Sequence, residues 1–133
     1  MSPLLRRGLA GLAGMAAAFI VIILVQQLNL MLHPLPPELD VKDKAALTAY
    51  ARTLPLLAFL IVLLGYALGG AAGGFVAAKV GRARSSATVV AVLLVIASIM
   101  NLSTIPHPAW FWVANLAVVA VSPFLGARFG AEA

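Results

Sequence analysis

Four long apolar stretches dominate this chain, and each is long enough to cross a lipid bilayer. The stretches cover residues 8–32, 53–79, 85–105 and 108–128. A helix rises about 1.5 Å per residue, so ~20 apolar residues span the ~30 Å hydrocarbon core of a bilayer. We therefore expect an all-α integral membrane protein, a four-helix transmembrane bundle that forms one domain over residues 1–133.

The composition agrees with a membrane domain. The chain is 63% hydrophobic and 10% charged, whereas about 25% of residues are charged in a typical soluble domain. The first stretch is not expected to be a cleaved signal peptide, because its run from Gly8 to Val25 exceeds the usual length of about 7–15 apolar residues. The lack of cysteine excludes a disulfide, a thiolate nucleophile and a cysteine-bound iron–sulfur cluster.

Basic residues give the chain a net charge of +5, and their positions favour a role in membrane topology over nucleic-acid binding. Most of them flank the ends of the apolar stretches, where positive charges set orientation and meet anionic lipid head groups. The first loop has three basic residues balanced by three acids, and the third loop has none. The positive-inside rule therefore predicts cytoplasmic N- and C-termini, with the first and third loops facing outward. The six basic residues on the predicted cytoplasmic side are Arg6, Arg7, Lys79, Arg82, Arg84 and Arg128.

The first loop is predicted to contain an element of its own. Three prolines within 33–37 prevent a helix from continuing, because proline lacks a backbone donor and fixes φ. Asp40 is expected to cap a new helix over about 40–52, with Asp43 in its first turn. Apolar and charged residues are mixed in that segment, which predicts a short interfacial helix.

The second loop is predicted to be a tight turn. Gly81 is expected to end the second span, and a serine at 85–86 is expected to cap the third span. The second and third spans should therefore be antiparallel neighbours.

Small residues repeat in the second span at a spacing that predicts close helix contact. A small residue at every fourth position forms a smooth stripe, along which two helix backbones can approach each other. Two uses of this stripe remain open, helix packing within one chain and an oligomer interface, because the motif does not identify its partner. The residues are Gly65, Gly69, Gly73 and Ala77 in one row, and Gly70 and Gly74 in a second row.

Polar side chains gather near the ends of the spans that are predicted to face outward. By depth they are expected to share one layer, either as interhelical hydrogen bonds or as a small polar site open to the outside. His33 and His107 would lie at its rim, where Glu38 or Asp40 could add oxygen ligands for a metal. No His-x3-His pair or cysteine accompanies them, so we assign no metal site, no catalytic residue and no cofactor. The residues of the possible polar site are Gln26, Asn29, His33, Asn101, His107 and Asn115.

Three segments resemble a group of small four-span bacterial inner-membrane proteins. They are His33-Pro-Leu-Pro-Pro37, Leu64–Gly70 together with Gly73–Ala78, and Met100–Phe111. The resemblance implies the four-span fold and a bacterial inner-membrane location, and it supplies no functional residues. The chain differs from small multidrug transporters of similar size, whose first span carries an essential embedded glutamate that is missing from 8–32 here.

These observations favour a non-enzymatic role. None of the spans carries a mid-membrane Asp, Glu, Lys, Arg or His, residues on which proton relays and many ion-coupled pumps depend. We expect a structural or accessory subunit that associates through its glycine-rich helix faces. The alternative is a small transporter or channel for a polar solute. The expected partners are the lipid bilayer and a homo-oligomer or larger membrane complex, without nucleic acid.

Overall fold

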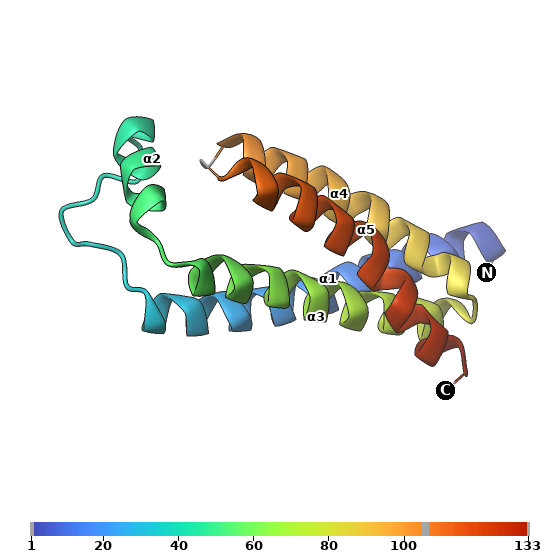
Figure 1. Ribbon diagram of the computed structural model, residues 1–133. Coiled ribbons are helices and arrows are strands. Elements are labelled where there is room, and N and C mark those ends of the chain that lie inside the picture. Colours follow the sequence, from blue (N-terminus) through green and yellow to red (C-terminus); the bar gives the residue numbers. More distant parts are fainter. Residues whose placement is uncertain (1, 105–106, 133) are drawn as a thin grey trace.

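The protein consists of helices joined by short connections, with one longer loop after the first helix (Figure 1). The computed structural model describes residues 2–104 and 107–132. No strand occurs among these residues, so the predicted all-α class is confirmed. The elements are α1 (Pro3–Leu32), α2 (Lys44–Thr53), α3 (Leu56–Gly81), the 3₁₀ turn η1 (Arg84–Ser86), α4 (Ala87–Thr104) and α5 (Ala109–Glu132).

Four helices, α1, α3, α4 with η1, and α5, are long and apolar enough to cross a membrane. They coincide with the four predicted spans, although α1 begins earlier than predicted. Ser2 caps this helix, because its Oγ accepts a hydrogen bond from the Leu5 amide at 3.1 Å, and Pro3 occupies the first turn, where proline is tolerated. With 30 residues, α1 is about 45 Å long. Its first turns, with Arg6 and Arg7, therefore reach past a ~30 Å hydrocarbon core.

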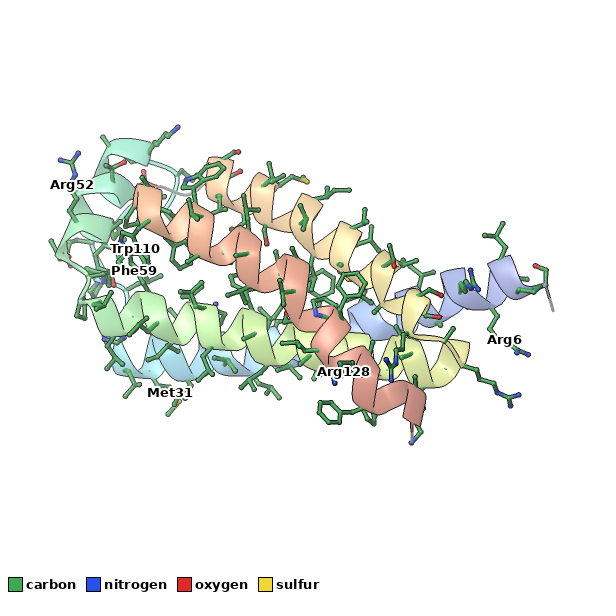
Figure 2. All side chains as sticks on the ribbon, turned by 45° about the vertical axis from the view of Figure 1, so that its right-hand side comes forward. Arg6, Met31, Arg52, Phe59, Trp110 and Arg128 are labelled. Carbon is green, nitrogen blue, oxygen red and sulfur yellow. The ribbon has the colours of Figure 1, made fainter. Side chains whose placement is uncertain are left out.

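The two ends of the bundle differ in charge. The termini and the α3–α4 turn lie at one end, the terminal end, and α2 lies at the other, the α2 end (Figure 1). Arg6 and Arg128 lie toward the terminal end and Arg52 lies at the α2 end (Figure 2). The six basic residues assigned to one side by the sequence are all exposed, and their helices bring them to the terminal end.

Helix α3 packs against α1 through the glycine row that contains Gly69 and Gly73. A Cβ on Gly73 would lie 2.7 Å from the carbonyl oxygen of Gly14, and a Cβ on Gly69 would lie 2.9 Å from that of Ala18. Real Cβ atoms essentially never come this close to a backbone oxygen. The glycines thus allow α1 and α3 to touch along their backbones, which gains dispersion contacts that larger side chains would prevent.

The second glycine row brings α3 against α5. A Cβ on Gly74 would collide with the carbonyl of Pro123, and a Cβ on Gly126 would collide with that of Ala71. The same relation holds between Gly130 and the carbonyl of Phe75. These contacts all lie in the half of the bundle nearer the terminal end, where α3 and α5 are closest.

Both glycine rows are buried in helix–helix contacts within one chain. All six residues are buried in the isolated chain and face α1 or α5. A second chain could not reach them unless one of those helices moved away. In the single chain, the glycine rows are thus used for packing against α1 and α5, and an oligomer interface along Gly65, Gly69, Gly73, Ala77, Gly70 and Gly74 stays a prediction.

At the α2 end the hairpin formed by α1 and α3 diverges from the hairpin formed by α4 and α5. In Figures 1 and 2, α4 and α5 run away from α1 and α3 toward that end. Aromatic rings replace glycines there, since the ring centroid of Phe59 lies 5.6 Å from that of Phe111 and 5.9 Å from that of Trp110. Rings hold helix axes farther apart than glycines do, so residue size along α3 accounts for the wedge shape.

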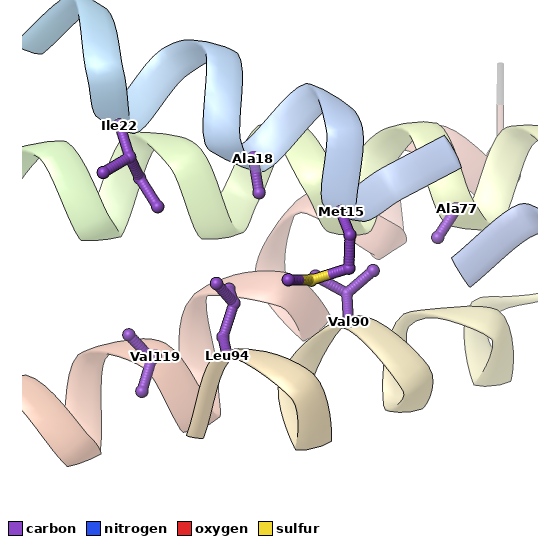
Figure 3. Close-up of a cluster of buried hydrophobic side chains, with 7 residues drawn as sticks. All are labelled: Met15, Ala18, Ile22, Ala77, Val90, Leu94 and Val119. Atoms are coloured by element: carbon purple, nitrogen blue, oxygen red, sulfur yellow. The ribbon is translucent and has the colours of Figure 1, made fainter. Parts of the chain in front are cut away.

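The hydrophobic core lies where all four long helices meet (Figure 3). Within this cluster, Ala18 and Ala77 lie beside the close α1–α3 contact, and larger side chains fill the space toward α4 and α5. The cluster consists of Met15, Ala18, Ile22, Ala77, Val90, Leu94 and Val119.

Two details of the loops differ from the predictions. Asp43 caps α2, because its Oδ1 accepts from the amides of Ala45 and Ala46, whereas Asp40 binds the Lys42 amide in a preceding turn. Gly81 ends α3 as predicted, and the left-handed conformation falls on the next residue, Arg82 (φ 56°).

The predicted serine cap of the third span is absent. A 3₁₀ turn precedes α4, and the buried Ser86 hydroxyl forms no hydrogen bond within the described part of the chain. Its Oγ instead contacts Gly81, where a Cβ would collide with it. A glycine at position 81 therefore allows the close approach of Ser86, and its role does not depend on a left-handed backbone conformation.

Candidate functional site

A cavity of about 330 Å³ lies at the α2 end, between α2 and the first turns of α3. We call it the α2 cavity. Its wall is mainly apolar, with polar atoms contributed by an amide, a phenol and an imidazole. Both hairpins contribute, because His107 precedes α5. The lining residues are Asn29, Leu35, Val41, Leu47, Tyr50, Ala51, Leu54, Ala58, Phe59, Val62 and His107.

The α2 cavity exists because α2 covers the bundle without packing tightly onto it. Asp43 fixes the start of this helix, and its charged residues Lys44 and Arg52 are exposed. Leu47 and Tyr50 are half-buried on the side that lines the cavity. No residue of α2 is fully buried, so the helix forms a roof with space beneath it.

Asn29 supports the wall of the α2 cavity by joining α1 to α3. Its Nδ2 donates to the carbonyl of Ala58 at 3.2 Å, and its Oδ1 lies 2.9 Å from Nδ1 of His33. An amide oxygen can only accept, so the histidine donates from Nδ1 in this contact. On the opposite side, the ring of His107 stacks on Phe111 at 4.9 Å between centroids. Asn29 and His107, which both line the α2 cavity, are thus held in place by residues of different hairpins.

A second cavity, of about 200 Å³, lies deeper among the spans. We call it the Tyr66 cavity. Within it, Asn101 Nδ2 donates a hydrogen bond to the hydroxyl oxygen of Tyr66 at 3.2 Å, which links α4 to α3. The lining residues are Phe19, Ile22, Tyr66, Leu94, Ala97, Ser98 and Asn101.

The two cavities follow one another along the same helix faces. Val62 lines the α2 cavity and Tyr66, one turn later on α3, lines the second cavity. Asn29 and Ile22, two turns apart on α1, have the same relation. Residues spaced by four or seven lie on one face of a helix. Both cavities therefore lie on the side of the first hairpin that faces the second.

Asn115 is a buried polar residue of α5 whose side chain has no hydrogen-bond partner among the described residues. Its side chain is 1% exposed, and no described residue hydrogen-bonds to its Oδ1 or Nδ2. Its neighbours one turn away on α5 pack with Leu102 and Leu94 of α4, which places it level with Ser98. An unpaired buried amide costs about 1–3 kcal/mol, so folding stability does not explain this side chain.

The predicted polar layer is thus divided into separate groups. Asn29 and His107 border the α2 cavity, and His33 is bound to Asn29. Asn101 lies in the Tyr66 cavity, whereas Asn115 is buried without a partner. Gln26 is half-buried and lines neither cavity.

Two tyrosines, Tyr50 and Tyr66, line these cavities although neither is among the residues predicted for the polar site. Tyr50 was predicted to lie on the interfacial helix, but nothing in its sequence neighbours signals the space beneath that helix. Tyr66 lies 35 positions from Asn101 along the chain, so no local pattern could have paired them.

The described residues bring no three His, Cys, Asp or Glu side chains together in a geometry for a metal ion. His33 and His107 are engaged by Asn29 and Phe111 respectively.

No protein-family model, curated protein or solved structure matches this chain.

Proposed function

We propose that this is a non-enzymatic membrane protein that binds a small, largely apolar molecule in the α2 cavity, as part of its uptake or transfer. The observation that carries the proposal is the cavity itself. Its volume of about 330 Å³ falls at the lower end of the ~300–1,000 Å³ usual for small-molecule sites, which are mostly apolar with a few placed polar groups. The apolar wall favours a ligand with one or two hydrogen-bonding groups over the fully polar solute considered from sequence.

The proposed location is a bacterial inner membrane, with both termini in the cytoplasm and the α2 cavity on the outward side. Six basic residues at the terminal end support this orientation through the positive-inside rule. The resemblance to small four-span bacterial proteins supports the choice of membrane. In this orientation α2 lies at the outer face of that membrane, and a ligand reaches the cavity from that face.

Single introduced cysteines test whether the α2 cavity is occupied in the membrane, because the chain has no cysteine of its own. Ala51→Cys places a thiol on the cavity wall, and Ala49→Cys places one on the exposed side of the same helix. A charged maleimide added from outside should label Ala51→Cys several-fold faster after bound small molecules are stripped by detergent. Ala49→Cys should label equally fast before and after. If detergent changed the labelling rate of the two variants equally, the result would contradict a ligand bound in the α2 cavity.

A second candidate function is that of an accessory subunit, and a groove on the α4–α5 hairpin favours it. The groove has a volume of about 310 Å³, and the small residues Thr88, Ala91 and Ala120 lie among the residues that line it. Small residues let a second transmembrane helix approach closely. In this proposal the partner, a second copy or another membrane protein, docks there and not on the glycine rows.

Ala120→Leu tests the groove against Ala117→Leu, an exposed position on the same helix. The first variant should dissociate a complex extracted gently from the membrane, and the second should not. An unchanged mass for Ala120→Leu would refute docking at this groove.

A further inference from the structure

We infer that the Tyr66 cavity is a second site, which binds the polar end of a neutral, lipid-soluble carbonyl compound such as an alkyl-quinone. This inference does not depend on a ligand in the α2 cavity. It rests on the polarity of the wall, the size of the cavity and the direction in which it opens.

The wall of the Tyr66 cavity offers donors without charge. Asn101 uses one N–H toward the Tyr66 oxygen, and an amide nitrogen carries two, so a second N–H is left. The Tyr66 oxygen accepts that bond, which leaves its own O–H to donate. The Ser98 hydroxyl also lines the space. A carbonyl oxygen, which only accepts, complements such a group of donors.

The seven described residues that line the cavity include no Lys, Arg, Asp, Glu or His. A charged head group would have to leave water without a counter-charge, which is costly inside a membrane. The wall therefore selects a neutral compound.

The volume limits what enters the cavity. About 200 Å³ is less than the ~300 Å³ at the lower end of ordinary ligand sites. A ring or another compact head fits, and a long alkyl tail does not. The remainder of an amphiphilic ligand must lie outside.

The cavity opens toward lipid, which gives the tail a place. Phe19 of α1 forms part of the wall and is 47% exposed, so one member of the wall reaches the lipid-facing surface. The remaining wall is aliphatic, from Ile22, Leu94 and Ala97. A ligand would enter sideways from the bilayer, with its carbonyl toward Asn101 and Tyr66.

The test measures binding of decyl-benzoquinone to the whole protein in lipid nanodiscs by native mass spectrometry, with decylbenzene as the probe that lacks carbonyls. We expect saturable binding of one quinone per chain and no saturable binding of decylbenzene. Tyr66→Phe should weaken quinone binding roughly fivefold, the effect of one neutral hydrogen bond. Asn101→Leu should weaken quinone binding more than Tyr66→Phe does.

Ala97→Leu should abolish binding by filling the cavity, and Ala117→Leu, the same change at an exposed position on α5, should leave it unchanged. Ala51→Phe in the α2 cavity should also leave it unchanged, which separates this site from the proposed function. Equal binding of decylbenzene, full binding by Ala97→Leu, or no saturable binding by the wild-type protein would each overturn the inference. Thermal unfolding of every variant identifies those that fail to fold, and Tyr66→Phe, which keeps the ring, then decides the outcome.

Discussion

At the scale of single residues, the glycines differ in what lies where a Cβ would be, because some face the backbone of a neighbouring helix and others face open space. Gly74 meets the carbonyl of Pro123, whereas Gly8 has no atom within 4 Å of the place where a Cβ would lie. The same substitution should therefore have different effects on stability at these two positions.

Gly74→Ala should lower the free energy of unfolding by about 1–3 kcal/mol, because the new methyl must push α5 away from α3. Gly8→Ala should leave stability unchanged or raise it by up to about 1 kcal/mol, since alanine favours a helix over glycine. Denaturation in detergent micelles, followed by circular dichroism, measures both. Equal effects of the two changes would contradict the close α3–α5 contact.

Asn115 and Asn101 form a second contrasting pair. Asn115→Leu should raise the free energy of unfolding by up to about 1–3 kcal/mol, because it removes a buried amide to which no described residue hydrogen-bonds. Asn101→Leu should lower it by roughly 0.6 kcal/mol, since it removes the bond to Tyr66. The same denaturation measurement compares them. A loss of stability in Asn115→Leu would show that this amide has a partner in the folded protein.

At the scale of elements, α2 depends on its cap more than the long helices do. It has 10 residues and none is fully buried, so neither length nor burial holds it. Asp43 supplies the acceptor for two amides of its first turn, and a cap of this kind contributes about 1 kcal/mol.

Asp43→Ala should therefore increase hydrogen exchange of the amides of residues 44–53 several-fold without changing exchange in the four spans. Glu38→Ala, an exposed carboxylate in the preceding loop, serves as the control and should have no effect. Exchange measured by mass spectrometry on the protein in nanodiscs gives the answer. Unchanged exchange in Asp43→Ala would refute the role of this cap.

The helices themselves were predictable from sequence, because an apolar run of span length has few alternatives in a membrane. The interfacial helix was also predictable from its mixture of apolar and charged residues. Its capping residue was predicted wrongly, since Asp40 and Asp43 are both suitable caps and the turn between them decides which one is used. The partner of the glycine rows depends on how the spans are arranged, which no local pattern encodes.

At the scale of the whole molecule, residue size along α3 creates the wedge that holds both cavities. Glycines bring α3 and α5 together toward the terminal end, and the Phe59 and Phe111 rings separate them toward the α2 end. The α2 helix then covers the widened end. The cavities were not predictable from sequence, because they arise between hairpins whose divergence depends on contacts far apart in the chain.

Native mass spectrometry of the protein, extracted gently from its own membrane, tests most directly whether the α2 cavity is a binding site. We expect the wild-type chain to retain a small apolar molecule, Ala51→Phe to lose it because the new ring fills the cavity, and Ala49→Phe to retain it. A wild-type protein without a bound small molecule, or equal retention by the two variants, would contradict the account.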